Sequence, residues 1–490
     1  MPGSPASLAA MPRKDEGLRA RFGLDPASAR AVVCVQGLGF VGAAMAAAIA
    51  SARGADGAPH FDVIGVELNT AQGRERAQRL HGGAFPFACP DPNIANALAA
   101  AHRAGNLVAT TDPAAFGLAH VAVVDVHLDI ADGGDGPPRI ALGVFEEAVR
   151  TLGRELPPGA LVVVETTVPP GTCANLAAPA LAAELAARHL PNDALLIAHS
   201  YERVMPGPDY FDSIVNFWRV YAGHTPAAAD ACAAFLSRVV DVKKYPLRRL
   251  GSTTASETGK VLENSYRAVN IAFIEEWARF AEAAGVDLFE VIGAIRDRPT
   301  HNNIRQPGFG VGGYCLTKDP LFAPAAVARY MPGRPLDFPF CATAMAVNRR
   351  MPVTNLDRIE ALAGGLAGKS LILLGVAYRS EVDDTRHAAS EIFYREAERR
   401  GARIVCQDPY VRRWPELGLA IDEALPDPRQ ADVVVLAVPH RAYRELDLAA
   451  WLGAARPLVY DCDNVLSDAT RAALRAVGLR VESTGRGLSL

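Results

Sequence analysis

The sequence lacks the marks of several protein classes. Its 8 cysteines include no CxxC pair, and they are scattered over positions 34, 89, 173, 232, 315, 341, 406 and 462. Neither a zinc cage nor a disulfide framework is therefore expected, and no metal site is predicted. The formal net charge is only -4. Without a basic excess or a long acidic run, we do not expect nucleic acid as a partner.

Long apolar runs are also missing. No stretch is long enough to cross a bilayer, and the segment from Met1 to Leu24 has no sustained apolar region of the signal-peptide kind. We therefore expect a cytoplasmic protein without a membrane partner. Residues 1–28 are predicted to form a loose or helical extension, in which Met11 could be an alternative start.

The 490 residues are too many for one hydrophobic core, so two or three domains are expected. Short apolar runs alternate with alanine-rich helical stretches from Ala31 onward, and again from about Gly368. This alternation is typical of βαβ units around a parallel sheet. We predict an α/β protein with two Rossmann-like doubly wound domains, residues 29–235 and 356–490, joined by a central all-helical domain of residues 236–355.

A long spine helix is predicted in the central domain. From Ser256 the sequence has no helix breaker before Gly285, a length that suits a spine between two domains or a dimer interface. Apolar residues recur there at spacings of three and four, which predicts one buried face made of Leu262, Tyr266, Val269, Phe273, Trp277 and Phe280.

A glycine-rich turn directly follows the first strand. Gly37, Gly39 and Gly42 form the pattern GxGxxG between a strand and a helix. The first glycine permits a tight turn, the second lets backbone approach a pyrophosphate, and the third lets helix and strand pack closely. The free N–H groups of the helix would then bind the phosphates. We expect this turn, with Phe40 and Val41, to bind a dinucleotide.

An acidic residue, Glu67, ends the next strand in VIGVELN. A carboxylate there accepts hydrogen bonds from a ribose diol and repels a 2′-phosphate, which favours NAD over NADP. The alternative is a glycine-rich turn beside a surface glutamate, and the strand–turn–helix context argues against it. The glycines do not identify what is oxidised.

A second glycine-rich run surrounds Cys315. Glycines at 308, 310, 312 and 313 precede it, and they would expose N–H groups to a phosphate or an oxyanion. Lys318 would lower the pKa of a nearby thiol, and Asp319 could position water. A lone cysteine is more often a packing residue, so Cys315 by itself does not establish a nucleophile.

Lys260 and Asn264 lie four residues apart on one face of the long helix, off its apolar stripe. An ammonium beside an amide would stabilise a developing alkoxide or oxyanion. The ordinary alternative is a solvated helix face, which the spacing alone does not exclude.

Taken in order, these segments resemble the UDP-glucose/GDP-mannose dehydrogenase family. The motifs run along nearly the whole chain and read GLGFVG, ETTVPPGT, YERVMPG, ETGKVLENSYRAVNIA, PGFGVGGYCLTKDP, GVAYRSEVDDTR and DPY. The resemblance implies an N-terminal NAD-binding domain, a central domain that forms a homodimer, and a C-terminal UDP-binding domain. It also implies a four-electron oxidation of a sugar CH2OH to COOH, using two NAD in succession.

The resemblance also implies roles for single residues. Cys315 resembles the nucleophile that forms a thiohemiacetal and then a thioester, while Lys260 and Asn264 resemble the pair that stabilises the oxyanion. Asp319 resembles the carboxylate that assists proton transfer, and Thr167 resembles the threonine that orders a catalytic water.

Further matched positions fall where members of the family bind ligands. Glu202 resembles an acidic residue beside the substrate, and it is predicted to be catalytic together with the residues named above. The predicted cofactor contacts are Gly37, Gly39, Phe40, Val41, Gly42, Glu67, Thr167 and Lys318. The predicted substrate contacts are Glu202, Arg203, Lys260, Asn264, Arg305, Gly312, Tyr378, Arg379 and Arg386.

Some segments depart from the family pattern. VVDVHLD, with His127 and Asp129, stands where a VPTP-like run is usual beside the nicotinamide, so cofactor contact at 126–129 stays open. Tyr201 stands where proline is common, DDTRHAA replaces DDTRESP, and the position of Glu67 is more often Asp. The candidates for an arginine that crosses the dimer interface are Arg296, Arg298 and Arg305.

The substrate expected from the resemblance is a UDP-N-acetylhexosamine. GVGG before the cysteine resembles the branch that acts on such nucleotides, whereas CxxKD matches the UDP-glucose branch, so UDP-glucose is the alternative. The family generally supplies acidic sugars for surface polysaccharides. Two other functions stay open: a single-step NAD-dependent hydroxy-acid dehydrogenase, and a non-catalytic nucleotide-sugar-binding regulator.

Overall fold

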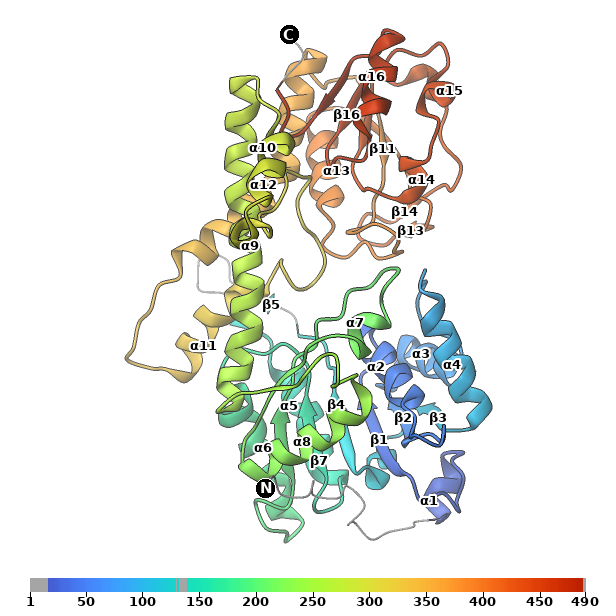
Figure 1. Cartoon of the computed structure of the whole chain (residues 1–490), viewed down its shortest axis with the longest axis vertical. Helices are drawn as coiled ribbons and strands as arrows, with labels where there is room; N and C mark the ends of the chain where they lie inside the picture. Colours follow the sequence, from blue (N-terminus) through green and yellow to red (C-terminus); the bar gives the residue numbers. More distant parts are fainter. Residues whose placement is uncertain (1–15, 129, 132–138, 488–490) are drawn as a thin grey trace. The chain divides into compact units, whose positions relative to one another are not determined.

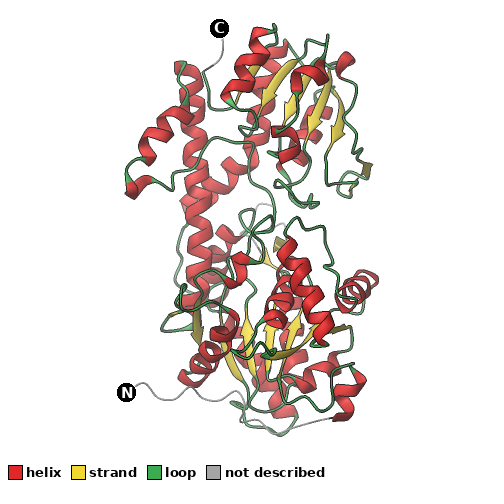
Figure 2. Cartoon of the chain, turned by 45° about the vertical axis from the view of Figure 1, so that its right-hand side comes forward, coloured by secondary structure: helices red, strands yellow, loops and turns green. Residues whose placement is uncertain are grey.

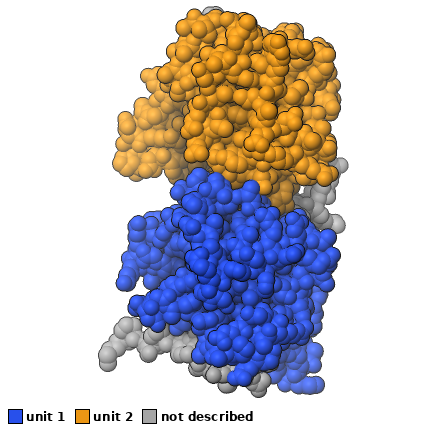
Figure 3. Space-filling view, turned by 90° about the vertical axis from the view of Figure 1, so that its right-hand side faces the viewer, with its two compact units in different colours: residues 1–262, 322–337 blue, residues 263–321, 338–490 orange. Residues whose placement is uncertain are grey.

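The computed structural model describes residues 16–128, 130–131 and 139–487. The chain forms two compact units, residues 1–262 with 322–337 and residues 263–321 with 338–490 (Figure 3). Within the predicted extension, helix α1 (Glu16–Arg21) is formed, whereas Met11 lies outside the described residues.

The first unit is built on a sheet with the strand order β10-β9-β8-β7-β4-β1-β2-β3. Neighbouring strands are parallel, except for the antiparallel pair β8 and β9. The strands are β1 (Ala31–Gln36), β2 (Phe61–Val66), β3 (Leu107–Thr110), β4 (Val121–Val124), β7 (Leu161–Val164), β8 (Leu196–His199), β9 (Val220–Gly223) and β10 (Arg248–Arg249).

Helices cover both faces of this sheet (Figures 1 and 2), as continuous apolar strands require. One core includes side chains of α2 (Phe40–Ser51), α3 (Ala71–His81), α4 (Pro92–Ala104), α7 (Asp212–Val215) and α8 (Pro226–Val239). The other includes α5 (Gly143–Glu155) and α6 (Ala178–Ala187). The strand order reverses between β1 and β4. Ligands of such sheets bind at this switch point, outside the carboxyl ends of the strands.

The second unit contains a parallel sheet with the order β12-β11-β15-β16-β17. The strands are β11 (Ser370–Leu374), β12 (Arg403–Gln407), β15 (Val433–Leu436), β16 (Leu458–Asp461) and β17 (Val481–Ser483). One face packs on α12 (Pro339–Ala363) and α13 (Ala389–Arg399). The other packs on α14 (Arg441–Arg444), α15 (Leu448–Leu452) and α16 (Asp468–Ala476). This sheet is therefore also doubly wound.

The segment between the two sheets is helical, as predicted. It contains α9 (Thr253–Ala284), α10 (Leu288–Arg296), α11 (Phe322–Tyr330) and α12, and α9 is the predicted spine helix. The fold class is confirmed. The compact units do not coincide with the predicted domain boundaries, which stay predictions. Among the helices of the described residues, none combines the length and apolarity that a bilayer crossing needs.

The prediction that the apolar stripe of α9 is buried was wrong for the single chain. Five of its six members, Leu262, Tyr266, Phe273, Trp277 and Phe280, are between 46% and 64% exposed. The buried face of α9 in the second unit instead carries smaller residues, such as Ala268, Ala272 and Ala278, which let neighbouring helices approach closely. The aromatic stripe therefore has no cover within the described chain.

Candidate active site

The glycine-rich turn leaves β1 as its motif predicts. Gly37 has a φ of +91°, and an added Cβ there would lie 2.6 Å from the carbonyl oxygen of Asp125. A Cβ on Gly42 would lie 1.9 Å from the carbonyl oxygen of Gly37, so only glycine allows α2 to pack this closely. A Cβ on Gly39 would meet nothing within 4 Å. The turn is therefore tight on its inner side and open on its outer side.

Helix α2 begins directly after this turn. Its N-cap residue, Gly39, makes no side-chain hydrogen bond to the helix. Phe40 stacks on Phe87 with ring centroids 3.9 Å apart, and its carbonyl oxygen accepts a 2.6 Å hydrogen bond from the Tyr210 hydroxyl. Val41 is half-buried. A fixed helix N-terminus without a side-chain cap, next to an open glycine, fits the pyrophosphate of a dinucleotide.

Glu67 lies directly after β2, as predicted. Its Oε1 is 3.1 Å from a guanidinium nitrogen of Arg76, and its Oε2 accepts a 2.8 Å hydrogen bond from the N–H of Leu68. Each carboxylate oxygen can accept more than one hydrogen bond, so a ribose diol could share these oxygens. The residue therefore fits its predicted contact with NAD.

Thr167 is half-buried in the turn after β7. The residue before it, Thr166, donates hydrogen bonds of 3.0 Å from its hydroxyl to the carbonyl oxygens of Val124 and Val126. This turn is therefore tied to the end of β4, beside the switch point.

Lys260 and Glu202 meet in the first unit. The Lys260 Nζ donates a 2.7 Å hydrogen bond to the Glu202 carbonyl oxygen and lies 3.5 Å from its Oε1. Both residues are buried, and the Glu202 carboxylate also accepts a hydrogen bond from the N–H of Val204. The predicted oxyanion-stabilising ammonium is thus held by the predicted substrate-binding glutamate.

Tyr201, which departs from the family pattern, has two cations near its ring. Lys260 Nζ lies 5.7 Å from the centre of its ring, and the Arg203 guanidinium lies 5.3 Å from it. Arg203 also donates a 2.8 Å hydrogen bond to the carbonyl oxygen of Trp218. An aromatic ring stabilises a cation above its face, so Tyr201 helps to position both side chains.

The second unit brings Cys315, Asp319, Asn264 and Lys318 together. The Asn264 amide donates a 2.7 Å hydrogen bond to Asp319 Oδ2, and Lys318 Nζ lies 3.1 Å from Oδ1. The N–H of Asp319 donates to the Cys315 carbonyl oxygen at 2.9 Å. Asp319 is fully buried, whereas Cys315 is the exposed cysteine of the chain. An exposed thiol therefore lies one helical turn from a carboxylate that two donors hold.

The glycines before Cys315 pack against the predicted nucleotide-binding motif. A Cβ on Gly312 would lie 2.4 Å from the carbonyl oxygen of His387, and one on Gly313 would lie 2.7 Å from the Tyr378 ring. The N–H of Gly313 also donates a 3.2 Å hydrogen bond to the carbonyl oxygen of Arg386. Only glycine permits this approach, so the loop that carries Cys315 packs directly against the predicted nucleotide-binding motif.

Two side chains of that motif, Arg386 and Tyr378, differ in what the structure shows for them. Arg386 binds Asp384 through two hydrogen bonds of 2.8 and 2.6 Å, and its guanidinium lies 4.3 Å from the centre of the Tyr314 ring. Burial raises the pKa of Tyr378 to about 12, so its phenol is neutral near pH 7. Tyr378 can therefore donate a hydrogen bond to a ligand.

A third arginine joins Arg305 and Arg379 near the thiol. Desolvation and the charges of Arg305 and Arg379 lower the pKa of Arg267, and the Cys315 thiol partly opposes this. Within the described part of the chain the three guanidinium groups form no ion pair, and Arg305 Nε is buried without a hydrogen-bond partner. Sequence reasoning missed Arg267, although its position three residues after Asn264 places both on one helix face. Such a cluster suits an anionic ligand.

The structure bears on two other predictions, the candidate arginines Arg296 and Arg298 and the segment 126–129. Arg296 donates to the carbonyl oxygen of Ile304 at 2.7 Å, and Arg298 is exposed, so neither joins the cluster of Arg305. His127 is exposed after β4, whereas Asp129 lies outside the described residues.

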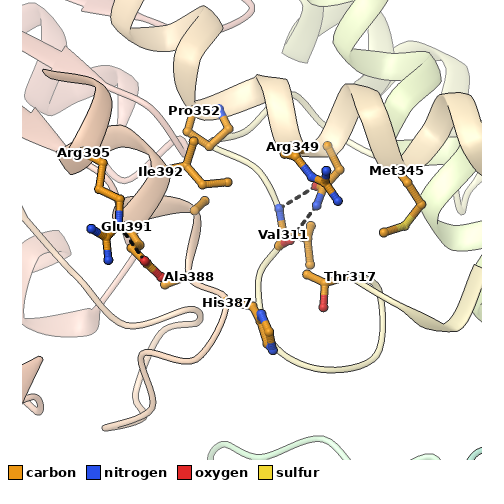
Figure 4. Close-up of a pocket in the computed structure, with 12 residues that line it drawn as sticks. Val311, Thr317, Met345, Arg349, Pro352, His387, Ala388, Glu391, Ile392 and Arg395 are labelled. Carbon is orange, nitrogen blue, oxygen red and sulfur yellow. Dashed lines mark hydrogen bonds and ion pairs between the residues drawn. The ribbon is translucent and has the colours of Figure 1, made fainter. Parts of the chain in front are cut away.

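A cavity of about 240 Å³ lies behind the thiol loop (Figure 4), and none of the predicted site residues lines it. At its edge, Asn348 of α12 accepts a 2.8 Å hydrogen bond from the N–H of Val311 and donates a 2.7 Å bond to its carbonyl oxygen. These two hydrogen bonds between the Asn348 side chain and the Val311 backbone hold the loop that leads to Cys315.

Known proteins resemble this chain over most of its length. A UDP-N-acetyl-D-mannosamine dehydrogenase of Methanocaldococcus jannaschii is 28% identical over 416 residues, which are 85% of this chain and 87% of that protein. The solved NDP-N-acetyl-D-galactosaminuronic acid dehydrogenase from Methanosarcina mazei Go1 is 26% identical with a TM-score of 0.75, over 98% of each chain. A UDP-glucose dehydrogenase structure from Pyrobaculum islandicum is 25% identical with a TM-score of 0.76, over 94% of this chain and 98% of that one.

Three successive segments also match the domains of one protein family. Residues 31–239 match the NAD binding domain, 254–350 the central domain and 372–468 the UDP binding domain. Their order is the predicted order, and together they cover most of the chain. The chain therefore belongs to the UDP-glucose/GDP-mannose dehydrogenase family and is an NAD-dependent nucleotide-sugar dehydrogenase.

Proposed function

We propose that this enzyme oxidises the C6 primary alcohol of a UDP-sugar to a carboxylate, in two oxidations joined by a covalent intermediate on Cys315. The observation that carries the proposal is the exposed Cys315, whose carbonyl oxygen accepts a hydrogen bond from the N–H of the buried Asp319. One oxidation of an alcohol needs no thiol. Two successive oxidations need the aldehyde to stay bound, and a thiohemiacetal provides that bond.

The cofactor contacts are proposed from the turn after β1, the end of β2, the turn after β7 and the loop after Cys315. They are Gly37, Gly39, Phe40, Val41, Gly42 and Glu67, with Thr167 and Lys318. When bound, NAD accepts the hydride in each oxidation.

The aldehyde is held by addition of Cys315 Sγ to C6. As the sulfur–carbon bond forms, the carbonyl oxygen becomes an oxyanion, which Lys260 and Asn264 stabilise with hydrogen bonds. In the described chain the Lys260 ammonium, with three donors, contacts Glu202, and the Asn264 amide, with two donors, binds Asp319.

The acid is released by water. The second oxidation leaves a thioester on Cys315, and a water ordered by Thr167 and Asp319 attacks its carbonyl carbon. The sulfur–carbon bond then breaks, and the thiol recovers a proton. In total, one alcohol and one water give one carboxylic acid and two protons, with two NAD reduced to NADH.

The substrate is proposed to be a UDP-N-acetylhexosamine. The nucleotide would lie against Tyr378, Arg379 and Arg386, and the sugar against Glu202, Arg203, Lys260, Asn264, Arg305 and Gly312. The names of the Methanocaldococcus and Methanosarcina relatives support an N-acetylated sugar. The Pyrobaculum relative supports UDP-glucose as the alternative.

A homodimer is proposed to cover the exposed aromatic stripe of α9. We also place the reaction in the cytoplasm, because the proposed nucleophile, Cys315, must stay reduced. The acidic sugar would serve the synthesis of a surface polysaccharide.

The test is a panel of UDP-N-acetylmannosamine, UDP-N-acetylglucosamine and UDP-glucose, assayed for NADH released per sugar consumed. Two NADH and a uronic acid support the proposal. One NADH would favour a single-step dehydrogenase, and tight binding without NADH would favour a regulator. Cys315→Ala should abolish acid formation, whereas the matched thiol variant Cys341→Ala should keep it. Acid formation by Cys315→Ala at the wild-type rate would refute the covalent scheme.

A further inference from the structure

We propose that Asp125 is a further residue of the dinucleotide site, and that it must carry a proton for the pyrophosphate of NAD to bind tightly. Asp125 belongs to VVDVHLD, which stands where a VPTP-like run is usual in the family. The proposal concerns cofactor binding alone and does not depend on the chemistry of Cys315.

Asp125 is packed against the glycine-rich turn. It directly follows β4, and its N–H donates a 2.9 Å hydrogen bond to the carbonyl oxygen of Gln36 at the end of β1. An added Cβ on Gly37 would lie 2.6 Å from the Asp125 carbonyl oxygen, and one on Gly42 would lie 3.1 Å from the Asp125 Cβ. The carboxyl group therefore lies under the turn that receives the phosphates.

The strand register places two more polar side chains beside Asp125. Val124 pairs with Val164, and Val164 pairs with His199, so the residues that follow these strands also lie side by side. They are Asp125, Glu165 and Ser200, and each has a buried oxygen without a hydrogen-bond partner in the described chain. In-register neighbours on parallel strands point to the same face.

The buried charges in this region do not balance. Three carboxyl groups, of Asp125, Glu165 and Glu202, influence one another electrostatically. The cations near them are Arg219, whose guanidinium donates a 3.0 Å hydrogen bond to Glu165, and Lys260, which holds Glu202. A third negative charge in a buried site would be uncompensated, so one carboxyl group keeps a proton near pH 7.

Among the described residues, the remaining titratable neighbours of these carboxyl groups supply no compensating charge. Burial and the charge of Lys260 lower the pKa of His199 to about 3, so its imidazole is neutral. Burial raises the pKa of the Cys232 thiol, which is also neutral. Burial raises the pKa of Glu165 to about 7 against the opposing charge of Arg219. Burial and the charge of Glu165 raise the pKa of Asp125, so the retained proton belongs to this pair.

The proton retained by Asp125 and Glu165 affects how tightly a pyrophosphate binds to the glycine-rich turn. A negative ligand near Asp125 opposes its ionisation, so the bound ligand raises the pKa of the pair formed by Asp125 and Glu165. At a pH above the pKa of this pair in the free enzyme, the protein therefore takes up a proton when the ligand binds. Affinity should therefore fall with rising pH, by up to about tenfold per pH unit for one proton. The effect should be the same for NAD and for ADP-ribose, which has the diphosphate but no nicotinamide.

The test is calorimetric titration with ADP-ribose and with NAD from about pH 6 to about pH 9, in buffers of different ionisation enthalpy. The wild-type protein should take up a proton at alkaline pH. Asp125→Asn, which imitates the protonated acid, and Asp125→Val should bind with an affinity that no longer depends on this titration. Asp230→Asn is the matched control, because the exposed Asp230 pairs with Arg249 on the surface of the same unit.

Three results would overturn the proposal. They are an ADP-ribose affinity of the wild type that does not change with pH, the absence of proton uptake, and a pH dependence of folded Asp125→Asn equal to that of the wild type. The wild-type proton uptake decides the question by itself if neither variant folds. A pH effect on NAD without one on ADP-ribose would place the influence on the nicotinamide and would also contradict it.

Discussion

Asn264 and Asp319 are joined by a 2.7 Å hydrogen bond from the amide Nδ2 to the carboxylate Oδ2, between residues 55 positions apart. Lys318 holds the other carboxylate oxygen. The orientation of Asp319 therefore depends on the spine helix α9 as well as on the loop that carries Cys315.

Asp319→Asn should lower kcat by roughly 10²- to 10⁴-fold, because an amide cannot accept a proton from water. Hydrolysis of the thioester should be the step that slows, so intact-protein mass spectrometry after mixing with substrate should find the acyl group on Cys315. Asp357→Asn, at a more exposed carboxyl group of α12, is the control. A wild-type rate in Asp319→Asn would contradict its assigned role.

Asn348→Ala should loosen the loop that carries the thiol, because it removes both hydrogen bonds to the backbone of Val311. We expect kcat to fall by about tenfold or more with the Kd for NAD unchanged, since misplacement of a reacting group by about 1 Å is enough for such a loss. Steady-state kinetics and cofactor titration measure the two quantities. Arg350→Ala, on the same helix, should change neither, and an equal loss in both variants would count against a specific clamp.

Trp277→Asp should dissociate the proposed homodimer, because it places a charge in the exposed aromatic stripe of α9. Sedimentation velocity should show a shift from dimer to monomer. Val144→Asp changes a residue of α5 that is 55% exposed and should leave the dimer intact. A wild-type protein that sediments as a monomer would refute the proposed assembly.

Glu275→Gln should make the protein more stable above neutral pH. Burial raises the pKa of Glu275 from 4.5 to about 7, although the charge of Arg358 opposes this. Between these values the folded protein binds more protons than the unfolded chain, so stability falls as pH rises, by up to about 1.4 kcal/mol per pH unit.

Denaturant unfolding at acidic and alkaline pH measures this loss, which Glu275→Gln should reduce. Glu276→Gln changes the exposed neighbour and should keep the wild-type pH dependence. An unchanged slope in Glu275→Gln would show that another group is responsible.

The sequence predicted the parts of the molecule that depend on local patterns. Short apolar runs and the glycine spacing predicted the two doubly wound sheets and the turn after Gly37, because these signals lie within a few neighbouring residues. The ordered motifs also located Cys315 and Asp319, and the structure brings both together with Asn264.

What the sequence could not predict depends on contacts between distant segments. The period of the α9 stripe indicates an apolar face, but period does not distinguish a face covered by the same chain from one left exposed, as Trp277 is. The engagement of Lys260 by Glu202 and the proximity of Arg267 to Arg305 likewise arise from tertiary packing. The position of Asp125 beside Glu165 likewise depends on the pairing of β4 with β7, and the burial of its Oδ2 is a tertiary feature.

The uneven exposure of the cysteines has a practical consequence. Cys315 is exposed, while Cys34, Cys173, Cys232 and Cys462 are fully enclosed and the other three are partly covered. A small alkylating reagent should therefore consume one equivalent per chain first, at the proposed nucleophile. The amount of reagent consumed in this first step would then measure the concentration of competent active sites in a preparation. No other cysteine would need to be replaced for this measurement.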